Sequence, residues 1–128
     1  MQRQQVPVAS SLGATIGYSR AVRAGDLVFV SGTTATAPEG GALHPGDAGK
    51  QTEVILDRIA AALRQLGAGL EDVVETRIYV TDIALWPAVG AAHGAAFKDI
   101  RPASTLVEVG ALIYPELLVE ISAIAATA

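Results

Sequence analysis

Two glutamates, Glu108 and Glu120, stand among apolar residues in segments that alternate in the manner of β-strands. Apolar surroundings raise the pKa of a carboxyl group, so that the group can exchange a proton near neutral pH. If the two segments are neighbouring strands, both carboxylates approach one surface. The alternative is that each glutamate lies at a solvated edge, paired with Arg77 or Arg101. Acid–base chemistry at Glu120 is the first hypothesis that the residues allow.

The other candidates for chemistry are spread along the chain. His93 lies on the apolar stripe of a predicted helix, where a core histidine bonded to the backbone is the more common finding. Ser31-Gly32 ends a predicted strand but lies in no GxSxG motif, so a hydrolase triad is not supported; its backbone N–H groups can still face an anion. Tyr18 and Arg20, two positions apart, can together hold a carboxylate.

Composition excludes several kinds of function. The chain has no cysteine and two histidines without metal-site spacing, which excludes thiolate chemistry and argues against a metal. A net charge of −4 with no basic cluster argues against nucleic acid. No apolar run reaches the ~18–20 residues of a membrane span, and the start lacks a signal-peptide pattern. We therefore expect a cytoplasmic protein that binds neither nucleic acid nor membrane.

The candidate residues are carried by a regular series of elements. Alternation predicts strands over 18–24, 27–31, 73–80, 103–109 and 117–125. A helical period predicts one helix from about residue 47 to 66 and a second near residue 86, with Pro87 in its first turn. The order ββαβαββ predicts a single α+β domain over 1–128, with two helices on one face of a small sheet. A loop over 33–49 separates the first two strands from the first helix.

The faces of these elements indicate which side chains are buried. On the strand over 73–80, one predicted face holds Val74, Ile78 and Val80, and the opposite face, away from the helices, holds Glu75, Arg77 and Tyr79. The second helix is expected to bury a stripe of Trp86, Val89, His93 and Phe97. The uncovered sheet face and a mean hydropathy of +0.41 predict an oligomer that hides apolar surface.

Several motifs occur in a fixed order: YSRAVRAGDLVFVSG at 18–32, QTEVILDRIAAAL at 51–63, DVVETRIYVTD at 72–82, RPAS ending at Ser104, then VEVGAL and LVEISAIA. In these motifs, from about Gly17 to Ala125, the chain resembles the Rid family of reactive intermediate deaminases, formerly YjgF. The resemblance implies a YjgF-like, chorismate-mutase-like fold with a mixed sheet. It also implies a homotrimer with three small-molecule clefts between subunits, and hydrolysis of 2-imino acids to 2-oxo acids and ammonia without cofactor.

The resemblance carries over to particular residues. Tyr18, Ser31, Gly32 and Glu120 stand where the family lines its cleft, and the glutamate is the proposed activator of the attacking water. The alternation at 73–80 places Glu75, Arg77 and Tyr79 on the face away from the helices, so we expect them at or near the centre of the trimer that the resemblance implies.

Four positions depart from the deaminase pattern. Ser104 replaces the arginine that grips the substrate carboxylate, and a hydroxyl cannot replace a bidentate guanidinium. Leu106 replaces a cysteine, Gly90 an asparagine, and His93 a tyrosine. These four residues are the further candidates for substrate binding.

Two interpretations are consistent with the four positions that differ from the deaminase pattern. Arg20 or Arg101 can restore an anion site, or the pocket has become more neutral and takes a bulkier molecule without a carboxylate; we favour the second from the sequence. The leading hypothesis is a cofactor-free hydrolase of a small imine or enamine, with Tyr18 and Glu120 as catalytic residues. The alternative is a non-catalytic trimer that binds a metabolite or a protein. Ribonuclease activity, also attached to the family, is disfavoured by the acidic pI of about 5.0.

Overall fold

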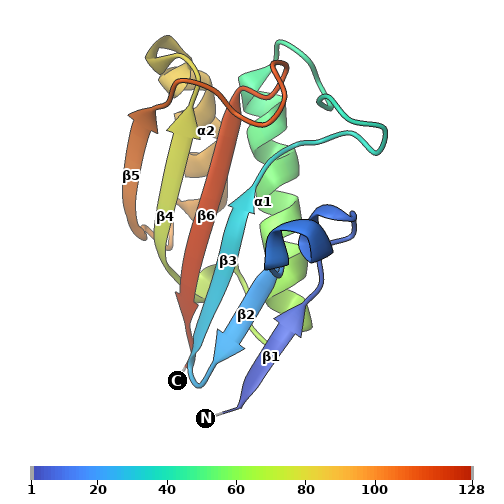
Figure 1. Cartoon of the computed structure of the whole chain (residues 1–128). Coiled ribbons are helices and arrows are strands. Elements are labelled where there is room, and N and C mark those ends of the chain that lie inside the picture. Colours follow the sequence, from blue (N-terminus) through green and yellow to red (C-terminus); the bar gives the residue numbers. More distant parts are fainter. Residues whose placement is uncertain (1, 128) are drawn as a thin grey trace.

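Six strands form one mixed sheet, and both α-helices lie on the same face of it (Figure 1). The computed structural model describes residues 2–127. The strands and helices are β1 (Arg3–Val6), β2 (Ala21–Ala24), β3 (Leu27–Thr33), α1 (Ala48–Gln65), β4 (Val73–Val80), α2 (Trp86–Phe97), β5 (Ala103–Glu108) and β6 (Val119–Ala126). The order across the sheet is β1-β2-β3-β6-β4-β5, with β4 and β5 parallel and the other neighbours antiparallel. The predicted α+β class, with two helices on one face of a mixed sheet, is confirmed.

The start and the end of helix α1 are determined by residues that can be recognised in the sequence. The Asp47 side chain accepts a hydrogen bond from the Lys50 amide at 3.0 Å and caps the first turn. Ile55, Ile59 and Leu63 are fully buried against the sheet. The helix stops before Gly67, whose φ of +77° is a conformation that glycine adopts without strain.

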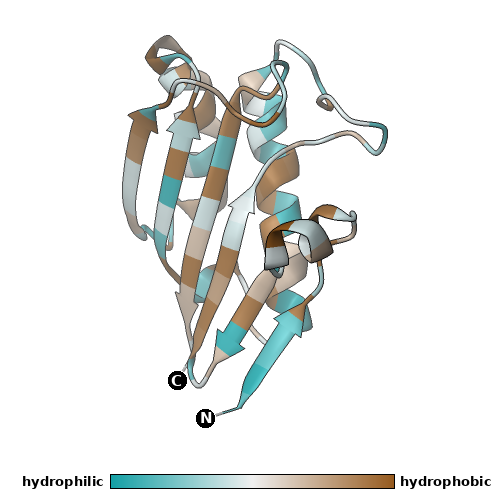
Figure 2. Ribbon diagram, viewed as in Figure 1, coloured by the Kyte–Doolittle hydropathy of each residue, from teal (hydrophilic) through white to brown (hydrophobic). Residues whose placement is uncertain are grey.

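Strand β1 is absent from the sequence-based prediction. It pairs with β2 as an edge strand whose first three residues are polar and exposed, so it shows no apolar alternation. Figure 2 shows it as the most hydrophilic strand of the sheet. The strand predicted over 18–24 is shorter, because Tyr18 and Arg20 precede β2.

Two residues expected in the core are exposed. Val74 is 49% exposed because the pairing of β4 with β6 shifts register between Val73 and Glu75, which leaves Val73 as the buried residue. Trp86 is 59% exposed at the first residue of α2, and the buried stripe of that helix begins at Val89. Pro87 lies in the first turn, as predicted.

The two strand glutamates do not meet. Strand β4 lies between β5 and β6, so Glu108 and Glu120 are separated by a strand. The Glu108 carboxylate instead accepts a hydrogen bond from the Ile83 amide at 2.9 Å. The expectation that both carboxylates share one surface is wrong, and Glu120 remains as the candidate.

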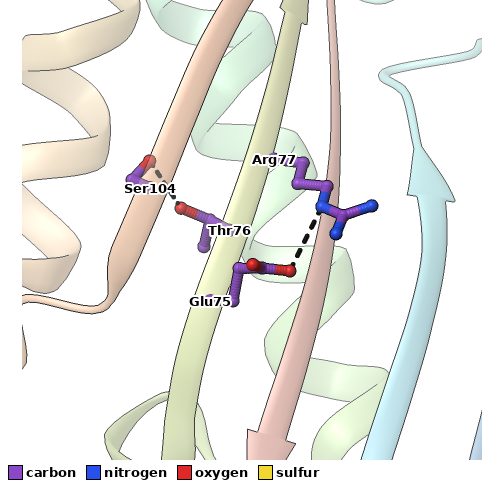
Figure 3. Close-up of polar contacts among 4 residues, drawn as sticks. All are labelled: Glu75, Thr76, Arg77 and Ser104. Atoms are coloured by element: carbon purple, nitrogen blue, oxygen red, sulfur yellow. Dashed lines mark hydrogen bonds and ion pairs between the residues drawn. The ribbon is translucent and has the colours of Figure 1, made fainter.

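The sheet face opposite the helices is uncovered and partly apolar. Leu27, Phe29 and Val107 are each 41–42% exposed. On strand β4, next to the edge strand β5, Arg77 and Glu75 point away from the helices as predicted and form an ion pair with an N–O distance of 3.2 Å (Figure 3). None of the helices in residues 2–127 combines the length and the apolar character needed to cross a membrane.

Candidate functional site

An open cavity of about 860 Å³ lies beside the C-terminal half of β3. Its walls come from the segment before β2, the loop after β3, helix α1, the loop before β6, and β6 itself. The cavity lies where regular pairing ends: β2 pairs with β3 only as far as Val30, and the β3–β6 register shifts between Val30 and Thr33. Three charged side chains line the cavity, namely Arg20, Arg58 and Glu120.

Glu120 lies on the uncovered face of the sheet, because its neighbours Val119 and Ile121 point into the core. Its carboxylate lies directly over Gly32, where an added Cβ would be 3.0 Å from Glu120 Cδ and closer still to Oε2. Among residues 2–127 the carboxylate forms no hydrogen bond or ion pair that would hold its charge. Burial raises the pKa of Glu120, and the positive charge of Arg20 partly opposes this.

Arg20 reaches the same cavity from the segment before β2. Its Nη2 donates to the carbonyl of Gly32 at 2.6 Å, and its guanidinium carbon lies 6.0 Å from the centre of the Tyr18 ring. Its Nε is buried without a hydrogen-bond partner. Burial lowers the pKa of Arg20, but an arginine remains charged at neutral pH.

Arg58 enters the cavity wall from α1 and was not singled out from the sequence. Its Nη1 donates to the Thr34 carbonyl at 2.7 Å, and its Nη2 donates to the Thr36 carbonyl at 3.0 Å. These bonds hold the loop after β3 against the helix. The sequence signal for Arg58 was a basic residue directly before Ile59 of the buried stripe, with no acidic residue in the following turn of the helix.

Gln51 is a second residue that the sequence analysis missed. It is fully buried, and its side-chain amide donates to the carbonyls of His44 and Glu116 at 3.2 and 3.0 Å. Its side-chain oxygen accepts from the Leu118 amide at 2.9 Å. The helix therefore fixes the loop that leads into β6. Gln51 extends the apolar stripe one turn before Ile55, and a polar residue at such a position signals a buried hydrogen-bonding role.

The structure brings Tyr18, Arg20, Ser31, Gly32 and Glu120 together around this cavity. Ser31 differs from its expected role, because its amide donates to the Arg20 carbonyl at 3.0 Å and its hydroxyl donates to the Ser19 carbonyl at 2.8 Å. Both donors are thus already used, and the Ser31 amide does not face an anion.

Arg101, the other arginine considered for an anion site, does not line the cavity. Its Nε donates to the Lys98 carbonyl at 3.0 Å in the turn after α2.

The remaining predicted site residues form a separate group around β4, β5 and α2. The Thr76 hydroxyl donates to the Ser104 hydroxyl at 2.8 Å, as Figure 3 shows, and lies 2.9 Å from His93 Nε2. A hydroxyl has one proton, so His93 Nε2 donates to Thr76. Burial lowers the pKa of His93, which keeps the ring neutral at pH 7.

Within one chain, the Ser104 and His93 side chains take part in a partly buried hydrogen-bond network centred on Thr76 rather than lining the cavity. Leu106 on β5, opposite Ile78 of β4, and Gly90 in α2 lie outside the cavity as well. No group of three histidine, aspartate or glutamate side chains in residues 2–127 is placed to hold a metal ion.

The contact between Gly32 and Glu120 gives a direct test of the site. Gly32→Ala places a methyl group where the Glu120 carboxylate lies, so we expect the carboxylate to be displaced. Because misplacing a catalytic group by about 1 Å has large effects on rate, any reaction that depends on Glu120 should slow by about tenfold or more. Gly94→Ala in α2 is the matched control, because nothing lies within 4 Å of its added Cβ. Equal turnover in the two variants would show that this placement of Glu120 does not matter.

Comparison with known proteins gives consistent matches over nearly the whole chain. The family described as Endoribonuclease L-PSP matches residues 8–127. The 3-aminoacrylate deaminase RutC of Acinetobacter baylyi is 35% identical over 108 residues, which cover 84% of this chain and 85% of that protein.

Solved structures show the same fold. The crystal structure of Rv2704 from Mycobacterium tuberculosis, a member of the YjgF/YER057c/UK114 family, is 50% identical with a TM-score of 0.89 and covers 98% of this chain and 100% of that one. The YjgF gene product of E. coli is 29% identical with a TM-score of 0.79, over 97% and 94% of the two chains.

Proposed function

Because the chain belongs to the Rid/YjgF/L-PSP family, we propose that it hydrolyses a small imine or enamine to a carbonyl compound and ammonia, without cofactor, in the cavity beside Glu120. The observation that carries this proposal is the half-buried Glu120 carboxylate, which faces an open cavity with no ion pair among residues 2–127. The enamine deaminase RutC, at 35% identity, supports the reaction class.

The proposed chemistry needs one base and one water. The imine reacts as its iminium form, which already carries the extra proton on nitrogen. The Glu120 carboxylate accepts a proton from water as the water oxygen bonds to the C=N carbon, and the product is a carbinolamine with a neutral amine. Glu120 then returns that proton to the nitrogen and accepts the hydroxyl proton as the C–N bond breaks, which releases ammonia and the carbonyl product. Its raised pKa makes Glu120 a stronger base than an exposed carboxylate and suits these proton transfers. The Tyr18 hydroxyl in the same cavity is proposed to orient the substrate.

A trapping competition tests the activity. An amino-acid oxidase generates an imine in the presence of semicarbazide, and semicarbazone formation is followed with and without this protein. We expect the protein to lower the yield of trapped imine in a concentration-dependent way. Unchanged trapping with every imine offered, together with a ligand-induced rise in Tm, would favour the alternative in which the cavity binds a metabolite without converting it.

We further propose a homotrimer in which the uncovered sheet faces meet, with Glu75, Arg77 and Tyr79 near the centre. In this assembly the β5 edge of one subunit, which carries Ser104 and Leu106, would close the cavity of the next. The exposed apolar residues of that face support burial of this kind.

Sedimentation tests the assembly. The protein is expected to sediment at about three times the chain mass of 13.1 kDa at micromolar concentration. Phe29→Glu, which places a charge on the uncovered face, should shift it toward monomer, whereas Trp86→Glu in α2, on the helix side, should not. A wild-type monomer would contradict the assembly.

A further inference from the structure

The backbone that the Glu120 carboxylate covers is held by a side chain instead of by regular strand pairing. Gly32 lies where the register between β3 and β6 shifts, between Val30 and Thr33. A shift of this kind releases backbone groups from the hydrogen bonds of the sheet. The Gly32 carbonyl accepts a bond from Arg20 Nη2 at 2.6 Å. Arg20 therefore fixes the peptide against which Glu120 lies.

Arg20 is itself anchored on both sides. Its amide donates to the Val6 carbonyl of β1 at 2.7 Å, and its carbonyl accepts from the Ser31 amide of β3 at 3.0 Å. Its guanidinium carbon lies 6.0 Å from the centre of the Tyr18 ring. The guanidinium is thus held beside the cavity before any substrate arrives, and such preorganisation is what an electrostatic role in catalysis requires.

This placement of Arg20 is unfavourable for stability. Among residues 2–127, its Nε is the one buried side-chain nitrogen or oxygen without a hydrogen-bond partner. Burial also lowers the pKa of Arg20, which means that the surroundings disfavour its positive charge. Buried polar atoms are normally paired, and departures from that rule concentrate at functional sites. The unpaired Nε indicates that Arg20 is needed in this position for more than packing.

The charge of Arg20 acts on Glu120. Burial favours the protonated form of that carboxyl group, and the positive charge of Arg20 opposes the resulting rise of its pKa. Arg58 also lines the cavity but donates to the Thr34 and Thr36 carbonyls. The other titratable groups on the same side are Tyr18 in the cavity wall, Tyr79, which is opposite Glu120 on β4, and Arg77, which is paired with Glu75.

We propose that Arg20 is a positioning residue for Glu120. Its hydrogen bond fixes the Gly32 peptide under the carboxylate, and its charge keeps the carboxylate ionised and able to accept a proton. The inference rests on the proposed function, in which Glu120 is the base, and adds the residue that prepares this base. Arg20 acts through Glu120 and not on the substrate.

The ionisation of Glu120 can be measured without any turnover. The protein would be labelled with ¹³C at the glutamate carboxyl groups, and the Glu120 signal assigned by its absence from Glu120→Gln. Titration by NMR then gives the pKa of Glu120. We expect Arg20→Met, which removes both the charge and the donor, to raise this pKa, because an opposite charge favours the ionised form. Arg20→Gln, also neutral, should raise it as well.

The kinetics test the positioning. In Arg20→Met the acid limb of the profile of kcat/KM against pH should move to higher pH together with the NMR midpoint. Above that limb kcat should fall by about tenfold or more, because the Gly32 peptide is released and Glu120 is misplaced. Arg20→Lys keeps a positive charge and a donor on a slightly shorter side chain, so it should keep the wild-type midpoint and recover most of the rate.

Arg23→Met is the matched control. Arg23 is also half-buried and lies three residues along the chain, but it donates to the Leu66 carbonyl and the Thr127 hydroxyl outside the cavity. This variant is expected to lose stability and to keep the wild-type titration of Glu120. Circular dichroism and sedimentation would show which variants are folded and assembled like the wild type.

The outcomes separate this inference from the proposed function. An unchanged Glu120 midpoint in both Arg20→Met and Arg20→Gln would overturn the inference, and so would a loss of rate confined to KM, which would make Arg20 a substrate-binding group. Imine hydrolysis through Glu120 would stand in either case. If the midpoint rises as expected but the wild type hydrolyses no imine, Arg20 still controls the ionisation of Glu120 and the proposed function is wrong.

Discussion

Glu120→Gln should lower kcat/KM for imine hydrolysis by about 10²–10⁴-fold, the usual contribution of a positioned general base. Glutamine keeps the size of the side chain over Gly32 but cannot accept a proton from water at neutral pH. The trapping competition measures the loss, with the oxidase held constant and the variant titrated against the wild type. Full activity in this variant would show that another group activates the water.

The pH dependence follows from the same carboxyl group. A base must be ionised, so kcat/KM should fall as the pH falls through the pKa of Glu120, which burial raises above its ordinary value of 4.5. The Gln variant should lack this limb of the profile. An activity that instead decreases as the pH rises through the same pKa would identify Glu120 as an acid in the rate-limiting step.

Stability provides the control for this variant. The raised pKa means that the folded protein binds the Glu120 proton more tightly than the unfolded chain does. The stability gained from that proton is present below the unfolded pKa and is lost as the pH rises through the folded pKa. Above the folded pKa of Glu120, where the carboxylate is ionised, the Gln variant should therefore melt no lower than the wild type, and its loss of activity would not reflect unfolding.

The orientation of Glu120 on strand β6 could be predicted from the sequence. Alternation in β6 places Val119 and Ile121 in the core and Glu120 on the opposite face, and the structure agrees. The buried face of α1 can be predicted equally well, because each buried position follows from the 3.6-residue helical period. Which side chains of a single strand or helix face the core can therefore be predicted from the sequence of that element.

Contacts between distant elements could not be predicted in the same way. Glu108 and Glu120 seemed able to meet because their strands are consecutive, yet β4 comes between them in the sheet. Arg58 lies 62 positions before Glu120, and only the packing of α1 behind β3 brings both to one cavity. Strand order and helix placement determine such contacts, and local periodicity carries no information about them.

The Ser104 side chain forms its hydrogen bond away from the cavity. Its hydroxyl accepts a hydrogen bond from buried Thr76, which in turn accepts one from His93, so the side chain completes a network across β5, β4 and α2. Guanidinium groups line the cavity instead at positions 20 and 58, directly before β2 and on α1. A serine at position 104 thus does not by itself indicate a neutral cavity.

Gln51→Leu should lower the free energy of unfolding by about 2–5 kcal/mol. Leucine fills nearly the same volume but leaves the carbonyls of His44 and Glu116 and the amide of Leu118 without their partner. Gln65→Leu, at the exposed last residue of the same helix, should change stability by no more than about 0.5 kcal/mol. Urea denaturation followed by circular dichroism measures both variants.

The Gln51 substitution also tests how the cavity is supported. The loop that Gln51 holds at Glu116 and Leu118 carries Ile113 and leads to Glu120, so the rate of imine hydrolysis should fall in Gln51→Leu even below its melting temperature. Gln65→Leu should keep the wild-type rate. If Gln51→Leu loses stability but hydrolyses the imine at the normal rate, the loop keeps its position without this residue, and the walls of the cavity depend on β6 and on the bonds of Arg58 instead.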